Sequence, residues 1–154
     1  MSIGIATTKL VDGQTIYWSR WLFYLVVCPL LVYDITKILS IIKEEYPKLA
    51  FLTGLTMFNG FLASFITTQS RWIFFILSSI AFIFLLYLIF QGKNNPKFKF
   101  IKPFVLIGWS LFPLVFLLAP TGIGILQTST SESLYLVLDL ITKLFFGILT
   151  IRLK

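Results

Sequence analysis

The sequence predicts an all-α transmembrane helical bundle. Of its 154 residues, 58% are hydrophobic and 12% are charged, against roughly 25% charged in an ordinary soluble domain. The mean hydropathy is +0.94. A soluble fold needs more polar surface than this composition can supply, and a disordered chain is poor in aromatic residues, whereas this one has 17 Phe. Cys28 is the single cysteine and histidine is absent, so we expect no internal disulfide and no Cys/His metal site.

Five segments are long and apolar enough to cross a bilayer, which takes about 20 residues rising about 1.5 Å each. Lipid offers no partners for open backbone groups, so each segment is expected to be a helix. Short polar joints separate the segments, and no internal repeat interrupts them. We therefore treat residues 1–154 as a single transmembrane domain. The predicted spans are residues 16–39, 49–67, 72–90, 104–126 and 134–153.

The basic residues of the joints predict how the chain is oriented. Cytoplasmic joints are rich in lysine and arginine. One side of the bundle would hold Lys37, Lys43, Lys48, Lys93, Lys97, Lys99, Lys102, Arg152 and Lys154. The other side would hold Lys9 and Arg71. This distribution predicts a multi-pass protein of the cell membrane with the N-terminus outside and the C-terminus in the cytoplasm. It also explains the basic net charge as a topology signal, so no nucleic-acid partner is expected.

Two charged residues lie in the last predicted span. A charge at the centre of a membrane helix costs about 2.5–3.5 kcal/mol, so it marks a functional site by default. Lys143 is about 13 Å from the nearer end of its span, beyond the reach of its side chain to the surface. Asp139 precedes it by four residues and shares its helix face. A desolvated lysine forms Schiff bases with carbonyl compounds. The alternative is an ion pair that only joins two helices.

The first predicted span also carries charge at both ends. Arg20 lies near the outer end, and Asp34 lies about 21 Å farther toward the cytoplasm on the same face. Both side chains could have a functional role, or both could lie at the helix ends and reach the lipid headgroups. Pro29 lies between them and is expected to kink the helix or leave a carbonyl unpaired.

Aromatic residues share one face of the fourth predicted span. Trp109, Phe112 and Phe116 are spaced by three and four residues around Pro113. Such a stripe could be simple helix packing, or it could be the wall of a pocket for a flat apolar ligand.

Several segments together resemble the microbial (type 1) rhodopsins. Tyr-Trp-Ser-Arg at residues 17–20, followed by Pro29 and Leu-Leu-Val-Tyr-Asp at 30–34, resembles their third helix. Residues 71–90 resemble the fifth helix, and Trp-Ser-Leu-Phe-Pro at 109–113 resembles the sixth. Leu-Asp-Leu-Ile-Thr-Lys-Leu-Phe-Phe-Gly at 138–147 resembles the seventh-helix segment that carries the retinal lysine. The five spans would then be helices three to seven. The resemblance implies that the first two helices come from another chain, or that the sequence is a fragment or remnant.

The resemblance also implies a cofactor, all-trans retinal, held as a protonated Schiff base on Lys143. Asp139 would be its counterion, and Arg20 would set the electric field on the outer side. The protein would lie in a lipid bilayer, with a homo-oligomer such as a trimer as the implied assembly. The residues implied to line the retinal are Phe23, Tyr24, Cys28, Trp109, Phe112, Pro113, Phe116 and Thr142. Thr142 could equally be a threonine that packs two helices.

One substitution in the first span indicates the subgroup. Outward proton pumps of this family carry an aspartate at the position of Phe23. Phe23, with Cys28 and Asp34, resembles the schizorhodopsins, which are light-driven inward proton pumps. Their Phe-Ser-Glu signature appears here as Phe23, Val27 and Asp34, so two of its three residues differ. The resemblance implies an inward proton pump, not an enzyme, in which Asp34 assists proton release to the cytoplasm. The alternatives are a sensory rhodopsin that signals to a partner, an anion pump, and a remnant without pigment.

Overall fold

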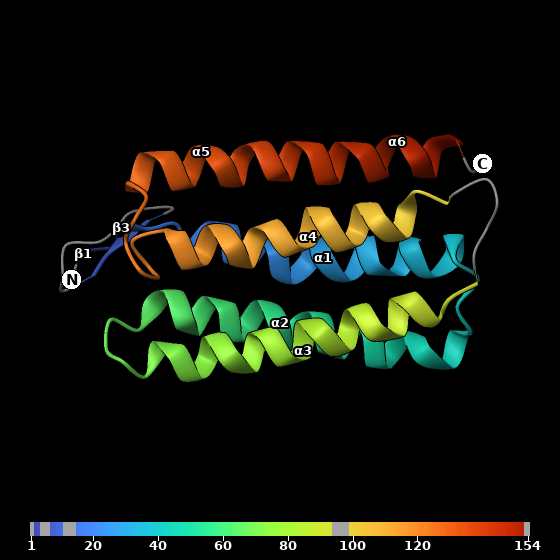
Figure 1. Ribbon diagram of the computed structural model, residues 1–154, viewed down its shortest axis with the longest axis horizontal. Coiled ribbons are helices and arrows are strands. Elements are labelled where there is room, and N and C mark those ends of the chain that lie inside the picture. The colour runs from blue at the N-terminus through green and yellow to red at the C-terminus, as the bar shows by residue number, and fades with distance from the viewer. Residues whose placement is uncertain (1, 4–6, 11–14, 94–98, 153–154) are drawn as a thin grey trace. The chain divides into compact units, whose positions relative to one another are not determined.

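The computed structural model describes residues 2–3, 7–10, 15–93 and 99–152. The chain forms two compact units, residues 1–93 and 94–154. The first contains a small sheet and the helices α1, α2 and α3 (Figure 1). The second contains α4 and a last helix made of α5, η3 and α6.

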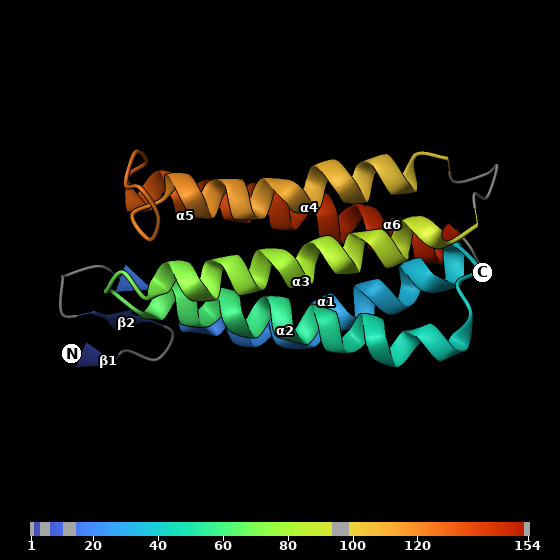
Figure 2. The same ribbon diagram turned by 60° about the horizontal axis from the view of Figure 1, so that its bottom comes forward.

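The first unit begins with three two-residue strands in one antiparallel sheet. These are β1 (Ser2–Ile3), β2 (Thr8–Lys9) and β3 (Thr15–Ile16), with β2 between the other two. Thr8 pairs with Ile3 on one side and with Ile16 on the other. The sheet lies at the end of the unit where α1 begins (Figure 2).

Helix α1 (Trp18–Ile38) is continuous through Pro29. Because proline has no N–H, the carbonyl four residues earlier loses its usual donor. The helix ends in a Schellman motif: the Ile41 N–H donates to the Thr36 carbonyl at 2.9 Å, and the Ser40 N–H donates to the Lys37 carbonyl at 3.3 Å. Ser40 takes the left-handed conformation of this motif, with φ of 50°, although glycine is the usual residue there.

Helix α2 (Tyr46–Phe65) follows the short turn η1 (Lys43–Glu45) and packs against both α1 and α3 (Arg71–Gln91). Small and polar residues allow this close packing, as in other membrane helix bundles. A Cβ at Gly60 would lie 2.8 Å from the Trp21 ring, so the absence of a side chain lets α1 approach. The Ser78 hydroxyl of α3 donates to the Thr56 carbonyl of α2 at 2.8 Å. The buried residues of α2 are Leu49, Thr53, Thr56, Asn59, Gly60, Ala63 and Ser64.

The second unit pairs α4 (Ile101–Leu118) with the last helix (Figure 1). The last helix consists of α5 (Thr128–Asp139), a π-helical segment η3 (Leu140–Leu144) and α6 (Phe145–Arg152). Between α4 and α5, the chain turns back and covers the end of α4: the Ile123 and Leu126 N–H groups donate to the carbonyls of Leu117 and Leu118 at 2.8 Å. Gly122 allows this turn, since a Cβ there would lie 2.2 Å from the Leu117 oxygen.

The structure corrects two predicted span boundaries. The fourth span was expected to reach residue 126, but α4 ends at Leu118, because Pro120 and the turn that follows it take the backbone out of the helix. The last span was expected to begin at residue 134, but α5 begins at Thr128. Its first turns are polar, so the hydropathy pattern did not reveal them. The other described helix ends lie within about three residues of the predicted boundaries. Leu153, Lys97 and Lys154 lie outside the described residues.

Three helices of the described part are long and apolar enough to cross a membrane: α1, α3 and α4. Helix α2 carries four buried polar residues, Thr53, Thr56, Asn59 and Ser64. The last helix is divided by its π-helical segment, so no single piece of it reaches 18 residues.

Candidate functional site

The ammonium group of Lys143 forms an ion pair with the carboxylate of Asp139 in the second unit. The four-residue spacing on one helix places them together. The Lys143 side chain is 18% exposed and the Asp139 side chain 22% exposed, so water screens the pair less than a surface pair. The site therefore combines an amine that could carry a covalent group with a carboxylate that would stabilise its positive charge.

The π-helical segment Leu140–Leu144 contains Lys143. Single π turns inside α-helices widen the backbone and occur often at functional sites. Thr142 is buried, and its hydroxyl donates to the Leu138 carbonyl at 2.7 Å. Its methyl group lies against α4, where a Cβ at Gly108 would be 3.3 Å away. Glycine in α4 thus brings the two helices close together beside Lys143. The packing role of Thr142 is seen directly, and its predicted contact with retinal stays a prediction.

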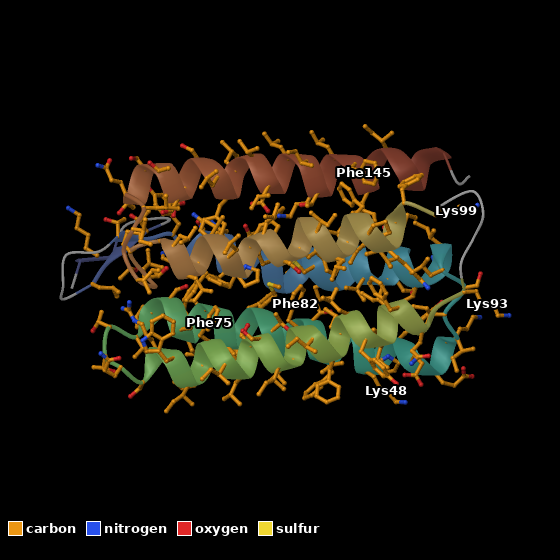
Figure 3. The ribbon with its side chains drawn as sticks, in the orientation of Figure 1. Lys48, Phe75, Phe82, Lys93, Lys99 and Phe145 are labelled. Atoms are coloured by element: carbon orange, nitrogen blue, oxygen red, sulfur yellow. The ribbon has the colours of Figure 1, made fainter. Side chains whose placement is uncertain are left out.

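Aromatic rings fill the contact between α4 and the last helix on the C-terminal side of Lys143. Phe146 is fully buried, and its ring centre lies 6.4 Å from Trp109 and 5.6 Å from Phe104. The ring centres of Phe145 and Phe104 lie 4.0 Å apart. Figure 3 shows Phe145 projecting from the last helix. These rings hold Trp109 next to the helix turn that follows Lys143.

On the other side of Lys143, Phe112 stacks on Tyr135 of α5, with ring centres 6.2 Å apart and planes 24° apart. Tyr135 precedes Asp139 by one turn. Phe116 is buried, and Pro113 is half-buried within α4, which continues through it. Trp109 and Phe112 of the predicted aromatic stripe thus contact the last helix on opposite sides of Lys143. Whether these rings line a ligand stays a prediction.

The remaining predicted residues lie on α1 in the first unit. The Arg20 guanidinium lies over the Tyr17 ring, 5.7 Å from its centre. Phe23 is 51% exposed, while Tyr24 is 5% exposed and packs edge-on against Trp21 at 6.0 Å. Cys28 is half-buried, and as the single cysteine it is not part of an internal disulfide. Their predicted roles at the retinal are not tested by these contacts.

Asp34 is half-buried near the C-terminal end of α1. One turn later, the Lys37 ammonium lies 4.1 Å from the centre of the Tyr33 ring, a cation–π contact. Tyr33 in turn packs edge-on against Tyr46 of α2 at 5.5 Å. Asp34 therefore has a lysine and a tyrosine as near neighbours along the chain, and this end of α1 is joined to α2.

Sequence reasoning missed three residues that shape the site. Tyr135 carries the stack with Phe112, Phe146 carries the contact with Trp109, and Gly108 admits Thr142. Helical spacing gave a signal for Tyr135, which lies one turn before Asp139. Gly108 and Phe146 depend on which helix lies opposite, so no local pattern could reveal them.

Comparison with known proteins identifies the family of this chain. The family model described as bacteriorhodopsin-like protein matches residues 1–154, so the chain belongs to this family. Sensory rhodopsin III of Haloarcula marismortui is 32% identical over 96% of this chain and 68% of its own length. Bacteriorhodopsin-II of the same organism is 25% identical, over 97% of this chain and 65% of its own length. The crystal structure of schizorhodopsin 4 superposes with a TM-score of 0.84 and 39% identity, covering 95% of this chain and 72% of that one.

These relatives place the chain among the microbial rhodopsins, as the sequence motifs predicted. It is a multi-pass membrane protein, and its five helices correspond to helices three to seven of the seven-helix rhodopsin fold. Members of this family bind retinal through a lysine and are light-driven transporters or sensors, not enzymes. The chain spans about 65% of the length of the bacteriorhodopsin relative. Pumps and sensors both occur among its relatives.

Proposed function

We propose that this chain is the retinal-binding part of a light-driven inward proton pump. The observation that carries the proposal is the absence of a carboxylate at Phe23, combined with the ion pair of Lys143 and Asp139. Outward pumps of this family place an aspartate at that position to accept the proton. The 39% identity to schizorhodopsin 4 supports the same subgroup.

The residues of the second unit fit retinal chemically. Lys143 offers an amine, Asp139 offers one negative charge beside it, and Trp109, Phe112 and Phe116 offer apolar surface on the neighbouring helix. Retinal, linked to Lys143 as a protonated Schiff base, would supply a light-driven change of shape that turns the N–H in a new direction. Asp139 would stay ionised, because it is the charge partner that stabilises the cation.

The direction of transport follows from α1. The Phe23 ring cannot take up a proton, so the outward route lacks a proton acceptor at this position. Asp34 lies about 16 Å along the same helix on the cytoplasmic side of the proposed topology. That distance is too long for direct transfer, so water would carry the proton, and the Asp34 carboxylate would attract it toward the cytoplasm. Reprotonation would then come from the outer side, past Asp139 and Arg20, and Arg20 would set the electric field on that side.

The proposal includes the topology and the partners. The N-terminus would lie outside and the C-terminus in the cytoplasm, as the basic joints predict. The first two helices of the rhodopsin fold would complete the bundle, because five helices alone would leave polar groups of the site facing lipid. A trimer of the completed protein is the proposed assembly.

Pigment formation tests the retinal site. The chain is produced alone and together with the first two helices of schizorhodopsin 4, and all-trans retinal is added. We expect a stable visible band in the completed form and its complete loss in Lys143→Ala. Lys48→Ala is the matched control, because Lys48 is an exposed lysine that pairs with Glu45 and should not affect colour. Absence of colour in both preparations would refute the proposed function, and a stable coloured monomer of the chain alone would refute the need for the first two helices.

Illumination of unbuffered cells tests the direction of transport. An inward pump makes the medium more alkaline, and an uncoupler abolishes the change. Asp34→Asn should slow or stop this uptake while leaving the colour largely intact, because Asp34 lies about 16 Å along α1 from Phe23, which is predicted to line the retinal. Acidification of the medium would contradict the inward direction.

A sensory rhodopsin is the second candidate, supported by the 32% identity to sensory rhodopsin III. A sensor would give colour with a slow return to the dark state and no net pH change. The same illumination experiment therefore separates the two functions.

A further inference from the structure

A stripe of polar side chains runs along one side of the last helix, from its second turn to Lys143. Its members are spaced by three or four residues, so they lie one above the other. All are half-buried, whereas the residues between them that face away from α4 are exposed. The polar stripe consists of Glu132, Tyr135, Asp139 and Lys143.

One contact and one burial pattern show that the polar stripe borders α4. Tyr135 stacks on Phe112 of α4. Immediately beside the stripe lies the buried face of the last helix, which includes Leu138 and Thr142. The stripe therefore follows the edge of the contact between the two helices.

Glu132 belongs to this stripe only because the helix begins at Thr128. The sequence pattern had placed it in a joint, where its direction would be undefined. In the helix, it lies seven residues before Asp139, which is two turns or about 10 Å. It is thus a half-buried carboxylate on the same face as the ion pair, at the end of the helix opposite the basic C-terminus.

We propose that Glu132 is the proton-uptake group that returns a proton to the Lys143 nitrogen after each transport cycle; this rests on the proposed function. Glu132 takes a proton from hydronium on the outer side and becomes neutral. It then releases this proton to water beside Tyr135 and Asp139, and that water passes one proton to the Lys143 nitrogen. Glu132 returns to its ionised form, and Asp139 remains charged throughout.

Flash spectroscopy of the coloured protein tests this role. The measured quantity is the rate at which the visible band returns after a flash, which reports reprotonation of the Lys143 nitrogen. We expect Glu132→Gln to slow the return about tenfold or more, since a positioned acid contributes 10²–10⁴-fold to proton transfer. Glu132→Asp should keep most of the rate. Added formate should accelerate the Gln variant, because a small weak acid can carry the proton itself.

Glu44→Gln is the matched control, because it removes an equal charge from an exposed position in η1. It should leave the return rate unchanged. An unchanged rate in Glu132→Gln would overturn the inference while the colour still upholds the retinal site. A slow return that formate does not accelerate would also overturn it, since that result indicates a structural role. Loss of colour in the unmodified protein would overturn the proposed function itself.

Discussion

The contact between Gly60 and Trp21 gives a sharp test of how the first unit packs. Replacing Gly60 with alanine would place a methyl group 2.8 and 2.9 Å from two ring carbons of Trp21, and 3.7 Å from the Ser78 hydroxyl. Carbon atoms pack best at about 3.5–4.0 Å, so the ring would have to move by more than about half an ångström. The ring is held by its edge contacts with Tyr24 at 6.0 Å and Phe61 at 6.5 Å, which limits that movement.

Two effects of this substitution oppose each other. Alanine is favoured over glycine within a helix by about 1 kcal/mol. Overpacking of a filled site costs about 1–3 kcal/mol. We therefore expect Gly60→Ala to lower the free energy of unfolding by up to about 2 kcal/mol. At Gly54, six residues earlier in the same helix, an added Cβ meets nothing within 4 Å. Gly54→Ala is the matched control and should raise the stability by about 0.5–1 kcal/mol.

The assay is unfolding of the detergent-solubilised chain, followed by tryptophan fluorescence as the denaturing detergent is increased. The two alanine variants should change stability in opposite directions. Trp21→Leu combined with Gly60→Ala should recover part of the loss, because the smaller side chain removes the close contact. Equal stability of Gly60→Ala and Gly54→Ala would refute the packing described for α1 and α2.

Two further predictions concern single groups of the first unit. Ser78→Ala should lower the free energy of unfolding by about 0.6 kcal/mol, the typical value for a hydrogen bond between membrane helices, because it removes the bond to the Thr56 carbonyl. Ser79→Ala removes a hydroxyl that donates to the Phe75 carbonyl of the same helix at 2.8 Å. It should cost less in the same unfolding assay, and an equal loss would contradict the interhelical role of Ser78. Ser40→Gly should raise the stability by about 0.5–1 kcal/mol, since a left-handed backbone costs an L-residue about 1–2 kcal/mol and costs glycine little. A less stable Ser40→Gly variant would contradict the strain assigned to this turn.

The chemistry of the site could be predicted from the sequence because its two main members are close together along the chain. Asp139 and Lys143 are four residues apart, and the helix period alone places them on one face. The sequence also predicted a membrane protein, because a bilayer requires long apolar segments and these can be read directly from the sequence. The motifs around Trp109 and Lys143 then indicated the family.

The neighbours of these residues could not be predicted in the same way. Phe146 against Trp109 and Tyr135 against Phe112 join residues that are far apart in the sequence. Which residue of one helix meets which residue of the next depends on the register of the packed helices. Gly108 is an example, because its role depends on the Thr142 methyl group of the opposite helix, which would lie 3.3 Å from a Cβ at this position.

The sequence by itself determined that the protein spans a membrane, which segments are helical, and that an amine and a carboxylate share one face of the last helix. These properties depend on hydropathy and on the helix period, which act over neighbouring residues. Only the tertiary structure decided that this helix begins at Thr128, that α4 ends at Leu118, and that Gly60 admits Trp21. Helix ends and close approaches depend on backbone hydrogen bonds and on side chains brought together from distant parts of the chain, and a local pattern carries no record of them.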